Sequence, residues 1–356
     1  MPTTIVTGSG GLIGSESVRY FVEAGHDVVG IENDMRAHFF GPTASTARVT
    51  ERLKDQYEEF HAVDMDIRDR EGIARLLEQR SSDLELVIHA AAQPSHDWAA
   101  RDPETDFTVN ANGTLNLLEA VRRQAPDATF IFCSTNKVYG DLPNQLPLVD
   151  LGARLDLPES HRYHRGIDTT MSIDRSMHSL FGVSKAAADL MVQEYGRYFN
   201  IPTVCARGGC LTGPNHAGAE LHGFLAYLMR CTVTGDRYSV HGYEGKQVRD
   251  NIHSRDLVNA FAEFHRAPRV AAVYNLGGGR ESNCSMLEAI SMCEQIAGRQ
   301  LDWELGHEAR KGDHRWWISD LGEFQVDYPN WRLTYDVETI LREIYEYNVE
   351  HWKVTA

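Results

Sequence analysis

Short apolar segments alternate with amphipathic stretches over residues 1–207. Residues 84–89 are a continuous apolar run, which is typical of a strand covered on both faces of a sheet. The predicted strands are residues 3–6, 27–31, 58–63, 84–89, 129–132 and 203–207, and the predicted helices are the segment after Gly14 up to Ala24 and residues 71–79, 107–123 and 178–199. This alternation of strand and helix predicts an α/β fold with a doubly wound parallel sheet.

The alternation weakens beyond about residue 215. Helices are expected there at 220–233, 254–266, 285–297 and 336–352, with short strands near 238–241 and 272–276. We therefore expect a first domain over residues 1–207, with contributions from later segments, and a smaller mixed α/β C-terminal lobe over residues 208–356 that binds the substrate.

A glycine-rich turn, Thr7-Gly8-Ser9-Gly10-Gly11-Leu12-Ile13-Gly14, joins the first predicted strand to the first predicted helix. In a dinucleotide-binding turn, one glycine frees φ, a second lets the backbone approach the pyrophosphate, and a third lets helix and strand pack closely. The alternative is a tight turn that binds no ligand. The strand–turn–helix context favours a Rossmann nucleotide site, whose predicted binding residues here are Gly8, Gly11, Leu12, Ile13 and Gly14.

Glu32 ends the second predicted strand, 18 residues after Gly14. An acidic side chain at that point accepts hydrogen bonds from the ribose hydroxyls and repels a 2′-phosphate, so it favours NAD over NADP. Arg36 lies close by and weakens this preference for NAD over NADP. The alternative for Glu32 is a solvated strand end that binds no ribose. Asn33 and Arg36 are also expected to contact the cofactor.

Later strand ends supply further candidates for the NAD site. Asp66 follows the third strand, where its carboxylate can meet the adenine amino group while Ile67 covers the ring. Ala90 and Ala91 follow the fourth strand, and their small side chains allow close approach of a cofactor. Residues 35–55 are interpreted as an irregular insertion near the adenosine, with a helix over 46–54 as the alternative. Residues 141–176 are expected to be a long loop, which usually has a role such as covering a site.

Composition excludes several classes of protein. The chain has 356 residues, 42% of them hydrophobic and 24% charged, as expected of a soluble globule, and its formal charge of −16 argues against nonspecific nucleic-acid binding. Six cysteines are scattered without a CxxC pair, so we expect neither a metal site nor a disulfide framework. The N-terminus is interpreted as a core strand rather than a signal peptide, and no apolar run reaches transmembrane length. We expect a cytoplasmic protein without a membrane partner.

Several motifs occur in the order found in one enzyme family. They are the Thr7–Gly14 turn, Asp66-Ile67, His89-Ala90-Ala91, Asn110 with Gly113-Thr114, Ser134-Thr135 with Val138-Tyr139-Gly140, Lys185, Gly213-Pro214, and Arg249-Asp250 before Ile252-His253. The chain thus resembles the extended short-chain dehydrogenases/reductases, the NAD-dependent epimerase/dehydratase family, over essentially its whole length. The resemblance implies that Asn110 and Lys185 contribute to the NAD site and that Thr135 hydrogen-bonds the reacting sugar hydroxyl. We also expect a homodimer.

Within this family the chain looks most like the CDP-paratose 2-epimerases. Asn136-Lys137 after Ser134-Thr135 is the main reason, because this pair is characteristic of that group. The family's dehydratases carry an acid pair at these positions, so an amide and an amine favour epimerisation of a nucleotide-linked sugar on a retained NAD. Asn136, Lys137, Arg249 and Arg315 are the predicted substrate ligands, the two arginines because a guanidinium binds diphosphate in a bidentate manner.

Two features depart from the family pattern, the catalytic motif and the loop at 208–216, where Cys210 occupies a position that usually holds a polar substrate contact. The catalytic Tyr-x-x-x-Lys sequence is here Phe181-Gly182-Val183-Ser184-Lys185, and Phe181 has no hydroxyl that could move a proton. Lys185 then keeps only its role toward the nicotinamide ribose. Oxidation of an alcohol still needs a base, and a thiol in an electropositive, partly exposed pocket can serve.

Cys210 is the first candidate for this base, and Cys133 is the second. Histidines near the predicted site are further candidates for proton transfer, although most are expected to be packing or surface residues: His96, His164, His178, His216 and His222. Two other functions stay open. The chain could be a net oxidoreductase or a dehydratase of the same family, or a dinucleotide-binding protein without turnover, which Phe181 supports.

Overall fold

The computed structural model describes residues 1–216, 223–306 and 312–355. The chain divides into two compact units, each built from segments that are separate in sequence. Unit 1 comprises Met1–Val138, Ser179–Arg207 and Val258–Tyr274, and unit 2 comprises Tyr139–His178, Gly208–Leu257 and Asn275–Ala356. The predicted division at residue 207 differs in two segments. Tyr139–His178 belongs to unit 2, and Val258–Tyr274 returns to unit 1 because it leads into a further strand of the central sheet.

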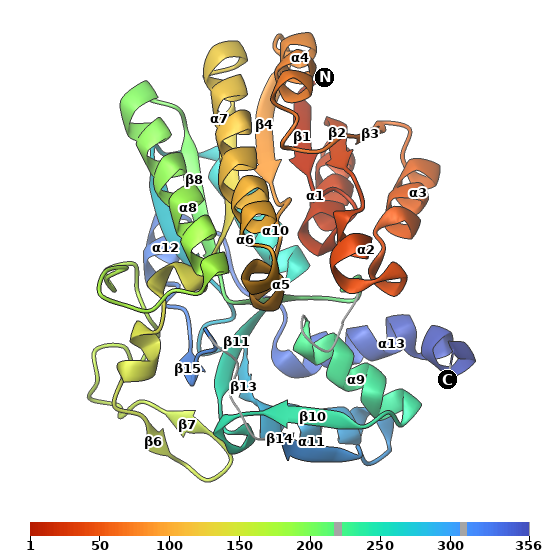
Figure 1. Ribbon diagram of the computed structural model, residues 1–356, viewed down its shortest axis with the longest axis vertical. Helices are drawn as coiled ribbons and strands as arrows, with labels where there is room; N and C mark the ends of the chain where they lie inside the picture. The colour runs from red at the N-terminus through yellow and green to blue at the C-terminus, as the bar shows by residue number, and fades with distance from the viewer. Residues whose placement is uncertain (217–222, 307–311, 356) are drawn as a thin grey trace. The chain divides into compact units, whose positions relative to one another are not determined.

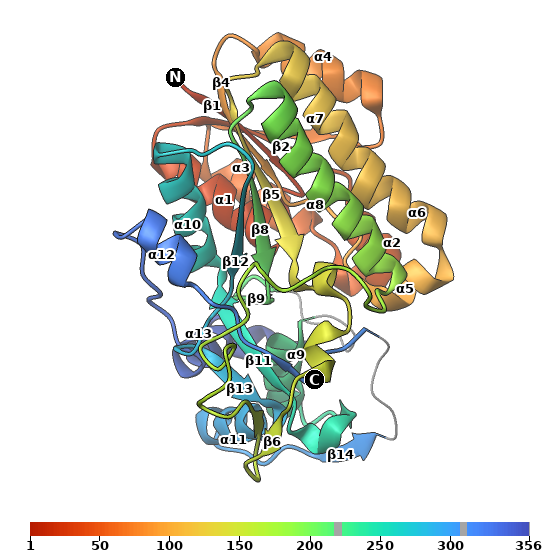
Figure 2. The ribbon, with the colours of Figure 1, turned by 90° about the vertical axis from the view of Figure 1, so that its left-hand side faces the viewer.

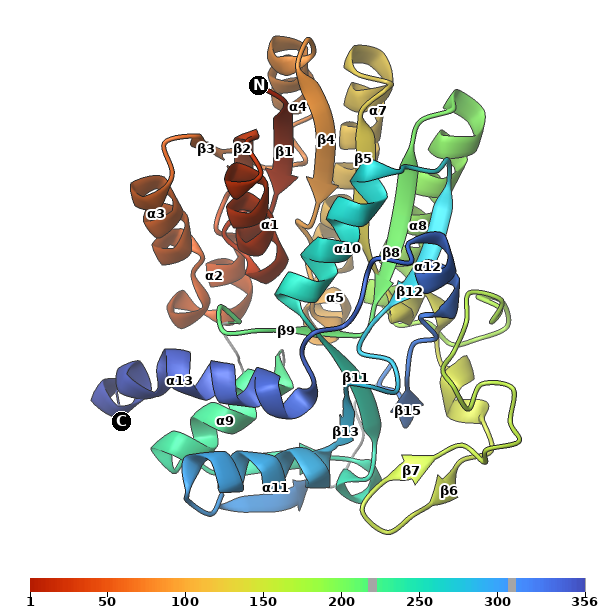
Figure 3. The same ribbon diagram turned by 180° about the vertical axis from the view of Figure 1, so that it is seen from behind.

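The central sheet of unit 1 has seven strands in the order β12-β8-β5-β4-β1-β2-β3. Figure 1 labels β8, β4, β1, β2 and β3, and Figure 3 also labels β5 and β12. The strands are β1 (Thr3–Thr7), β2 (Asp27–Glu32), β3 (Phe60–Asp64), β4 (Leu84–His89), β5 (Thr129–Thr135), β8 (Thr203–Gly208) and β12 (Ala272–Leu276). The β1–β2, β1–β4, β2–β3 and β4–β5 pairs are parallel. This is the predicted Rossmann sheet, extended at one edge by β12, a strand expected in the second lobe.

Helices cover both faces of this sheet. Figure 2 shows α4 (Arg70–Arg80), α7 (Gly113–Gln124) and α8 (Leu180–Phe199) on one face, and α1 (Leu12–Glu23) and α10 (Ser254–Arg266) on the other. The N-termini of α4 and α8 are capped by side chains, since Asp69 accepts a hydrogen bond from the Gly72 amide and Ser179 accepts one from the Gly182 amide. The shorter elements are α2 (Met35–Phe40), α3 (Ala47–Gln56), α5 (His96–Arg101), α6 (Pro103–Phe107) and a π-turn at Thr108–Asn112.

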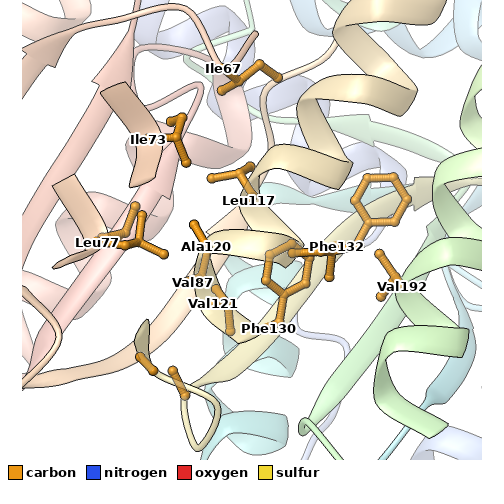
Figure 4. Packing of buried hydrophobic residues seen from close by; sticks show 14 of the residues in the cluster. Ile67, Ile73, Leu77, Val87, Leu117, Ala120, Val121, Phe130, Phe132 and Val192 are labelled. Carbon is orange, nitrogen blue, oxygen red and sulfur yellow. The ribbon is translucent and has the colours of Figure 1, made fainter. Parts of the chain in front are cut away.

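The core of unit 1 lies between the sheet and the helices α4, α7 and α8. Figure 4 shows Phe130 and Phe132 of β5 with Val87 of β4, packed against Leu117 of α7 and Val192 of α8. All five side chains are fully buried. Burial of strand side chains on both faces explains the continuous apolar runs in the sequence.

Unit 2 contains shorter sheets. β10 (Tyr238–His241) pairs in parallel with β14 (Trp303–Gly306), and β6 (Val149–Asp150) pairs antiparallel with β7 (Leu155–Asp156). β11 (Val248–His253) pairs antiparallel with β13 (Asn283–Ser285) and in parallel with β15 (Trp316–Trp317) and β9 (Cys210–Thr212). This arrangement is the mixed α/β structure that the sequence predicted for the second lobe.

Three helices of unit 2 pack together: α9 (Phe224–Thr234), α11 (Met286–Ala297) and α13 (Val337–Thr355) (Figure 3). They share a buried core with Tyr238 and Val240 of β10. α11 begins at a capping box in which Ser285 and Glu288 each bind the other's backbone amide. A further short helix is α12 (Gly322–Asp327). None of the helices in the described part of the chain is long and apolar enough to cross a membrane.

Three expectations differ from the structure in detail. The segment 35–55 holds two α-helices, α2 and α3, with a 3-10 turn at Pro42–Ala44 between them, and the alternative helix over 46–54 corresponds to α3. The helix expected over 107–123 is divided, because a π-turn precedes α7. The first residues of the helix expected over 220–233 lie outside the described residues, and α9 begins at Phe224.

Candidate active site

The glycine turn holds α1 close to β1. Gly8 has φ +68°, and a Cβ on Gly8 would lie 2.9 Å from Ala91 Cα, so only glycine fits there. A Cβ on Gly14 would lie 2.0 Å from the Gly8 carbonyl oxygen. The residue that precedes α1 is Gly11, which provides no side-chain cap, so the first amides of this helix are open to an anion. The turn therefore has the close packing and the free amides of a pyrophosphate site.

Glu32 lies at the end of β2, and its carboxylate is bound by one backbone amide of the glycine turn and by the two amides that follow β2. Its Oε2 accepts a hydrogen bond from the Gly10 amide (3.0 Å), and its Oε1 accepts from the amides of Asn33 (3.0 Å) and Asp34 (2.9 Å). These contacts fix the carboxylate beside the glycine turn and leave it partly exposed. Arg36 is close enough for the Glu32 charge to affect it, and burial lowers the pKa of this guanidinium.

Asp66 and Ile67 follow β3, and both side chains have partners within the protein. The Asp66 carboxylate is paired with the Arg68 guanidinium (2.7 Å). Although burial alone would raise the pKa of Asp66, Arg68 holds it below its usual range. Ile67 is only 5% exposed and packs against Gly113, where a Cβ would lie 2.5 Å from its Cδ1. The predicted contacts of both side chains with adenine stay predictions.

A buried chain of hydrogen bonds fixes the loop that carries Ala90 and Ala91. The Ala91 amide donates to Thr7 Oγ1 (3.1 Å), which lies 2.7 Å from His89 Nδ1. His89 Nε2 lies 2.9 Å from Thr114 Oγ1, which donates to the Asn110 carbonyl (2.6 Å). Because Thr114 donates its hydroxyl proton to the Asn110 carbonyl, Thr114 Oγ1 can only accept a hydrogen bond from His89. Nε2 must therefore be the protonated nitrogen of a neutral His89. Burial lowers the pKa of His89 to about 3, which keeps the ring neutral.

Asn110 binds protein groups on all sides rather than facing solvent. Its Oδ1 accepts from the Gln93 amide (2.9 Å), and its Nδ2 contacts the Gln93 carbonyl, Asp106 Oδ1 and Ser184 Oγ at 3.0 Å each. The side chain is 2% exposed. These contacts join the loop after β4 to α8, so Asn110 is suited to positioning that loop.

Lys185 projects from α8 onto the end of β5. Its Nζ donates to the Cys133 carbonyl (2.8 Å) and lies 4.1 Å from the centre of the Phe132 ring. Burial lowers the pKa of Lys185 to about 8, against the opposing effect of nearby acidic groups. Burial also raises the pKa of the Cys133 thiol to about 12, so Cys133 is a poor base near neutral pH.

Thr135 ends β5 beside Asn136. Its hydroxyl accepts from the Lys137 amide (3.2 Å) and lies 3.4 Å from Asn136 Oδ1. Asn136 is buried, whereas Thr135 and Lys137 are partly exposed. The Thr135 oxygen is thus held at a strand end by local contacts and can still reach a ligand.

Phe181 lies in the first turn of α8, next to an imidazole. The His96 ring meets the Phe181 ring edge to face, with centroids 5.1 Å apart. His96 Nδ1 is 2.7 Å from the Oγ of Ser179, the residue that caps α8. His96 is therefore the histidine candidate that the structure places beside the missing phenol.

Unit 2 holds the two predicted diphosphate ligands, Arg249 and Arg315, and the candidate base Cys210. The Arg249 guanidinium pairs with Asp313 (2.7 Å), and Arg315 lies over the Tyr243 ring at 5.9 Å from its centre. Although burial lowers the pKa of Arg249, the charges of Asp313 and Cys210 raise it overall. The Cys210 side chain therefore lies within electrostatic reach of Arg249. A guanidinium near a thiol stabilises the thiolate.

Two of the remaining histidine candidates, His164 and His178, have local partners. His164 Nδ1 contacts the Leu157 carbonyl at 3.0 Å, and His178 Nδ1 lies 3.2 Å from the Ser176 carbonyl. His216 is 8% exposed, and His222 lies outside the described residues. These contacts suit structural roles better than proton transfer.

A sequence profile of the NAD dependent epimerase/dehydratase family matches residues 4–277. The chain belongs to this family. The predicted family is therefore confirmed, and NAD is the cofactor. When bound, NAD supplies reversible hydride transfer.

The relatives include both epimerases and dehydratases. The chain is 27% identical over 328 residues to the CDP-paratose 2-epimerase of Salmonella typhi, covering 89% of this chain and 90% of that protein. It is 28% identical over 325 residues to dTDP-glucose 4,6-dehydratase 1 of Escherichia coli, covering 86% and 83%. The fold is similar to that of the Bacillus cereus UDP-glucuronic acid 4-epimerase in complex with UDP-glucuronic acid and NAD (TM-score 0.77, 23% identity, 99% and 100% coverage). It is also similar to that of the Thermus thermophilus UDP-glucose 4-epimerase complex with NAD (TM-score 0.76, 23% identity, 99% and 100% coverage).

The residues of unit 1 fit the cofactor that this family uses. A dinucleotide pyrophosphate needs closely packed glycines and open amides at a helix start, and the turn from Gly8 to Gly14 has both. Glu32 is fixed at the end of the neighbouring strand, where the ribose of a bound dinucleotide would meet it. Lys185 lies where it could exchange the Cys133 carbonyl for a ribose hydroxyl.

Sequence reasoning missed several residues that hold this family's site in place. His89 was noted only as part of a motif, and its partners Thr7 and Thr114 carried no separate signal. Asp189 was also missed, although it accepts hydrogen bonds from Ser134 and Arg207 beneath the end of β5. Buried polar pairs between distant segments leave little trace in one sequence. A polar residue on the apolar face of a predicted helix, such as Asp189 on α8, is the one signal that could have found it.

Proposed function

We propose that this chain is an NAD-dependent epimerase of a nucleotide-linked sugar, of the 2-epimerase type. Asn136 and Lys137 carry the proposal, because they follow Thr135 directly at the end of β5. A dehydratase needs an acid and a base that eliminate water, and an amide with an amine cannot act as that pair. The similarity to the CDP-paratose 2-epimerase of Salmonella typhi supports the same activity.

We propose a role for each predicted site residue. Thr135 would bind the hydroxyl that is oxidised and later reduced, and Lys185 would bind the ribose next to the reacting carbon. Arg249 and Arg315 in unit 2 would bind the diphosphate, Arg249 after exchanging Asp313 for a phosphate oxygen. Asn136 and Lys137 would contact the sugar. Cys210 is the proposed base, since Phe181 has no hydroxyl and the pKa of the Cys133 thiol is too high.

Two other functions have support of their own. The similarity to a dTDP-glucose 4,6-dehydratase of Escherichia coli favours a dehydratase, although the Asn136-Lys137 pair argues against it. Phe181 favours a protein that binds the dinucleotide without turnover, because the usual proton carrier is absent.

One preparation can separate these functions. We expect the denatured protein to release NAD rather than NADP, and the native protein to convert a CDP-, UDP-, dTDP- or GDP-linked sugar into its epimer without a lasting rise in absorbance at 340 nm. NMR identifies the product. A keto sugar that has lost water would indicate a dehydratase, stoichiometric NADH an oxidoreductase, and bound NAD with no conversion of any sugar a binding protein.

We also infer that the chain forms a homodimer through the outer face of α7 and α8. These helices pack side by side, and they expose Leu115 (37%), Val183 (46%) and Leu190 (43%). A self-complementary apolar face is what a twofold dimer needs. Light scattering should give about twice the chain mass of 40.1 kDa, and a Val183→Glu, Leu190→Glu double variant should give the monomer. The matched control is Val326→Glu on α12, where the side chain is 79% exposed. A monomeric parent would refute the inference.

A further inference from the structure

Between β10 and β11 the backbone makes a left-handed turn of four consecutive residues. Gly242 and Gly245 have φ +71° and +74°, which glycine adopts freely. Between them Tyr243 has φ +52° and Glu244 has φ +54°. A bulky aromatic residue rarely adopts this conformation, which costs about 1–2 kcal/mol per residue. Local backbone preference therefore does not account for a tyrosine at position 243.

The charged groups around the Tyr243 side chain are those assigned to the substrate diphosphate. Arg315 lies over the ring, 5.9 Å from its centre. Burial and the Asp313 charge raise the pKa of the Tyr243 phenol, whereas Arg249 and Arg315 lower it. The phenol thus lies within electrostatic reach of both arginines and of the carboxylate that pairs with Arg249.

We propose that Tyr243 is a substrate-binding residue that donates its phenolic hydrogen bond to the diphosphate of the nucleotide sugar and supports Arg315 with its ring. The proposal rests on the proposed function, since it adds a third ligand to the same diphosphate. A neutral O–H donor near two guanidinium groups can bind a phosphate oxygen without adding positive charge beside the cations. Strained residues held at binding sites are a recurring way to aim one side chain at a ligand.

The turn is also fixed by Lys246, the residue that follows Gly245. The Lys246 amide donates to the Tyr243 carbonyl (3.0 Å), and Lys246 Nζ contacts the carboxylates of Glu244 (2.9 Å) and Asp150 (2.7 Å). Glu244 is exposed and shares the left-handed conformation, but it has no role toward the diphosphate. It therefore provides a matched control for changes made in the same turn.

The test is calorimetric titration of the full-length protein with CDP and UDP, together with the melting temperature of each variant. Tyr243→Phe should weaken binding of the preferred nucleotide roughly tenfold to a hundredfold, the range for a hydrogen bond to a charged group, with an unchanged melting temperature. Arg315→Ala should weaken binding to a similar extent. Glu244→Gly should bind like the parent.

The outcomes separate this inference from the proposed function. If Arg315→Ala binds weakly but Tyr243→Phe binds like the parent, the diphosphate site stands and the role of Tyr243 is refuted. If Tyr243→Phe loses affinity only together with a fall in melting temperature, the residue is structural and the proposal also fails. A parent protein that binds neither nucleotide nor any nucleotide sugar would refute the proposed function and this inference together.

Discussion

A Cys210→Ala variant is expected to convert its nucleotide sugar about 10²–10⁴-fold more slowly than the parent protein while keeping its bound NAD, because this is the usual contribution of a general base. The family's phenol is absent at Phe181, so another group must take the proton of the hydroxyl that is oxidised and return it after reduction. Cys210 is partly exposed, and a thiolate there would lie within electrostatic reach of the Arg249 guanidinium. The measurement is the steady-state rate with the true substrate, with released NAD assayed in the same samples.

Two controls keep this prediction specific. Cys133→Ala should turn over at nearly the parent rate, because burial holds the pKa of that thiol at about 12. Cys210→Ser should also be slow, since an ordinary hydroxyl is a far weaker base than a thiolate. Near-normal turnover by Cys210→Ala would refute the assignment. His96, whose ring is 5.1 Å from that of Phe181, is then the next group to replace, as His96→Gln.

The order of strands and helices could be predicted because its cause is local. Strands buried on both faces need continuous apolar runs, and the segment 84–89 shows this as β4, with burial of all its side chains except that of Glu85. The glycine turn could also be predicted from the sequence, since Gly8 and Gly14 lie where any side chain would collide with the backbone. The NAD cofactor and the family follow from that turn and from the motifs behind it.

What the sequence could not provide depends on contacts between distant segments. The return of Val258–Tyr274 to unit 1 requires β12 to join the edge of the central sheet. The pattern of apolar residues does not indicate which sheet edge can accept a further strand. Arg249 was predicted as a diphosphate ligand without any sign that Asp313, 64 residues later, pairs with it. Tyr243 gave no signal at all, because its significance lies in a backbone angle.

Replacing Asp189 by alanine is expected to lower the free energy of unfolding by about 3–5 kcal/mol, the usual cost of removing one partner of a buried ion pair. Asp189 and Arg207 are 1% and 5% exposed, and their side chains are 2.7 Å apart. The Asp189 carboxylate also accepts hydrogen bonds from Ser134 and from Gln193 (2.7 Å). Without it the Arg207 guanidinium would keep its burial and lose its carboxylate partner. Urea denaturation of parent and variant measures the difference.

The controls for Asp189 distinguish a buried charge from a lost contact. Glu194→Ala, on the same helix, removes an exposed ion pair with Arg197 and should cost less than about 1 kcal/mol. Asp189→Leu combined with Arg207→Met removes both charges and should recover much of the stability lost by Asp189→Ala, since a well-packed apolar pair avoids the desolvation cost of the ions. A loss below about 1 kcal/mol for Asp189→Ala would show that water reaches Arg207. Because Ser134 binds Asp189 and directly precedes Thr135, the charge-free double variant should still be slow in turnover even where its stability has been recovered.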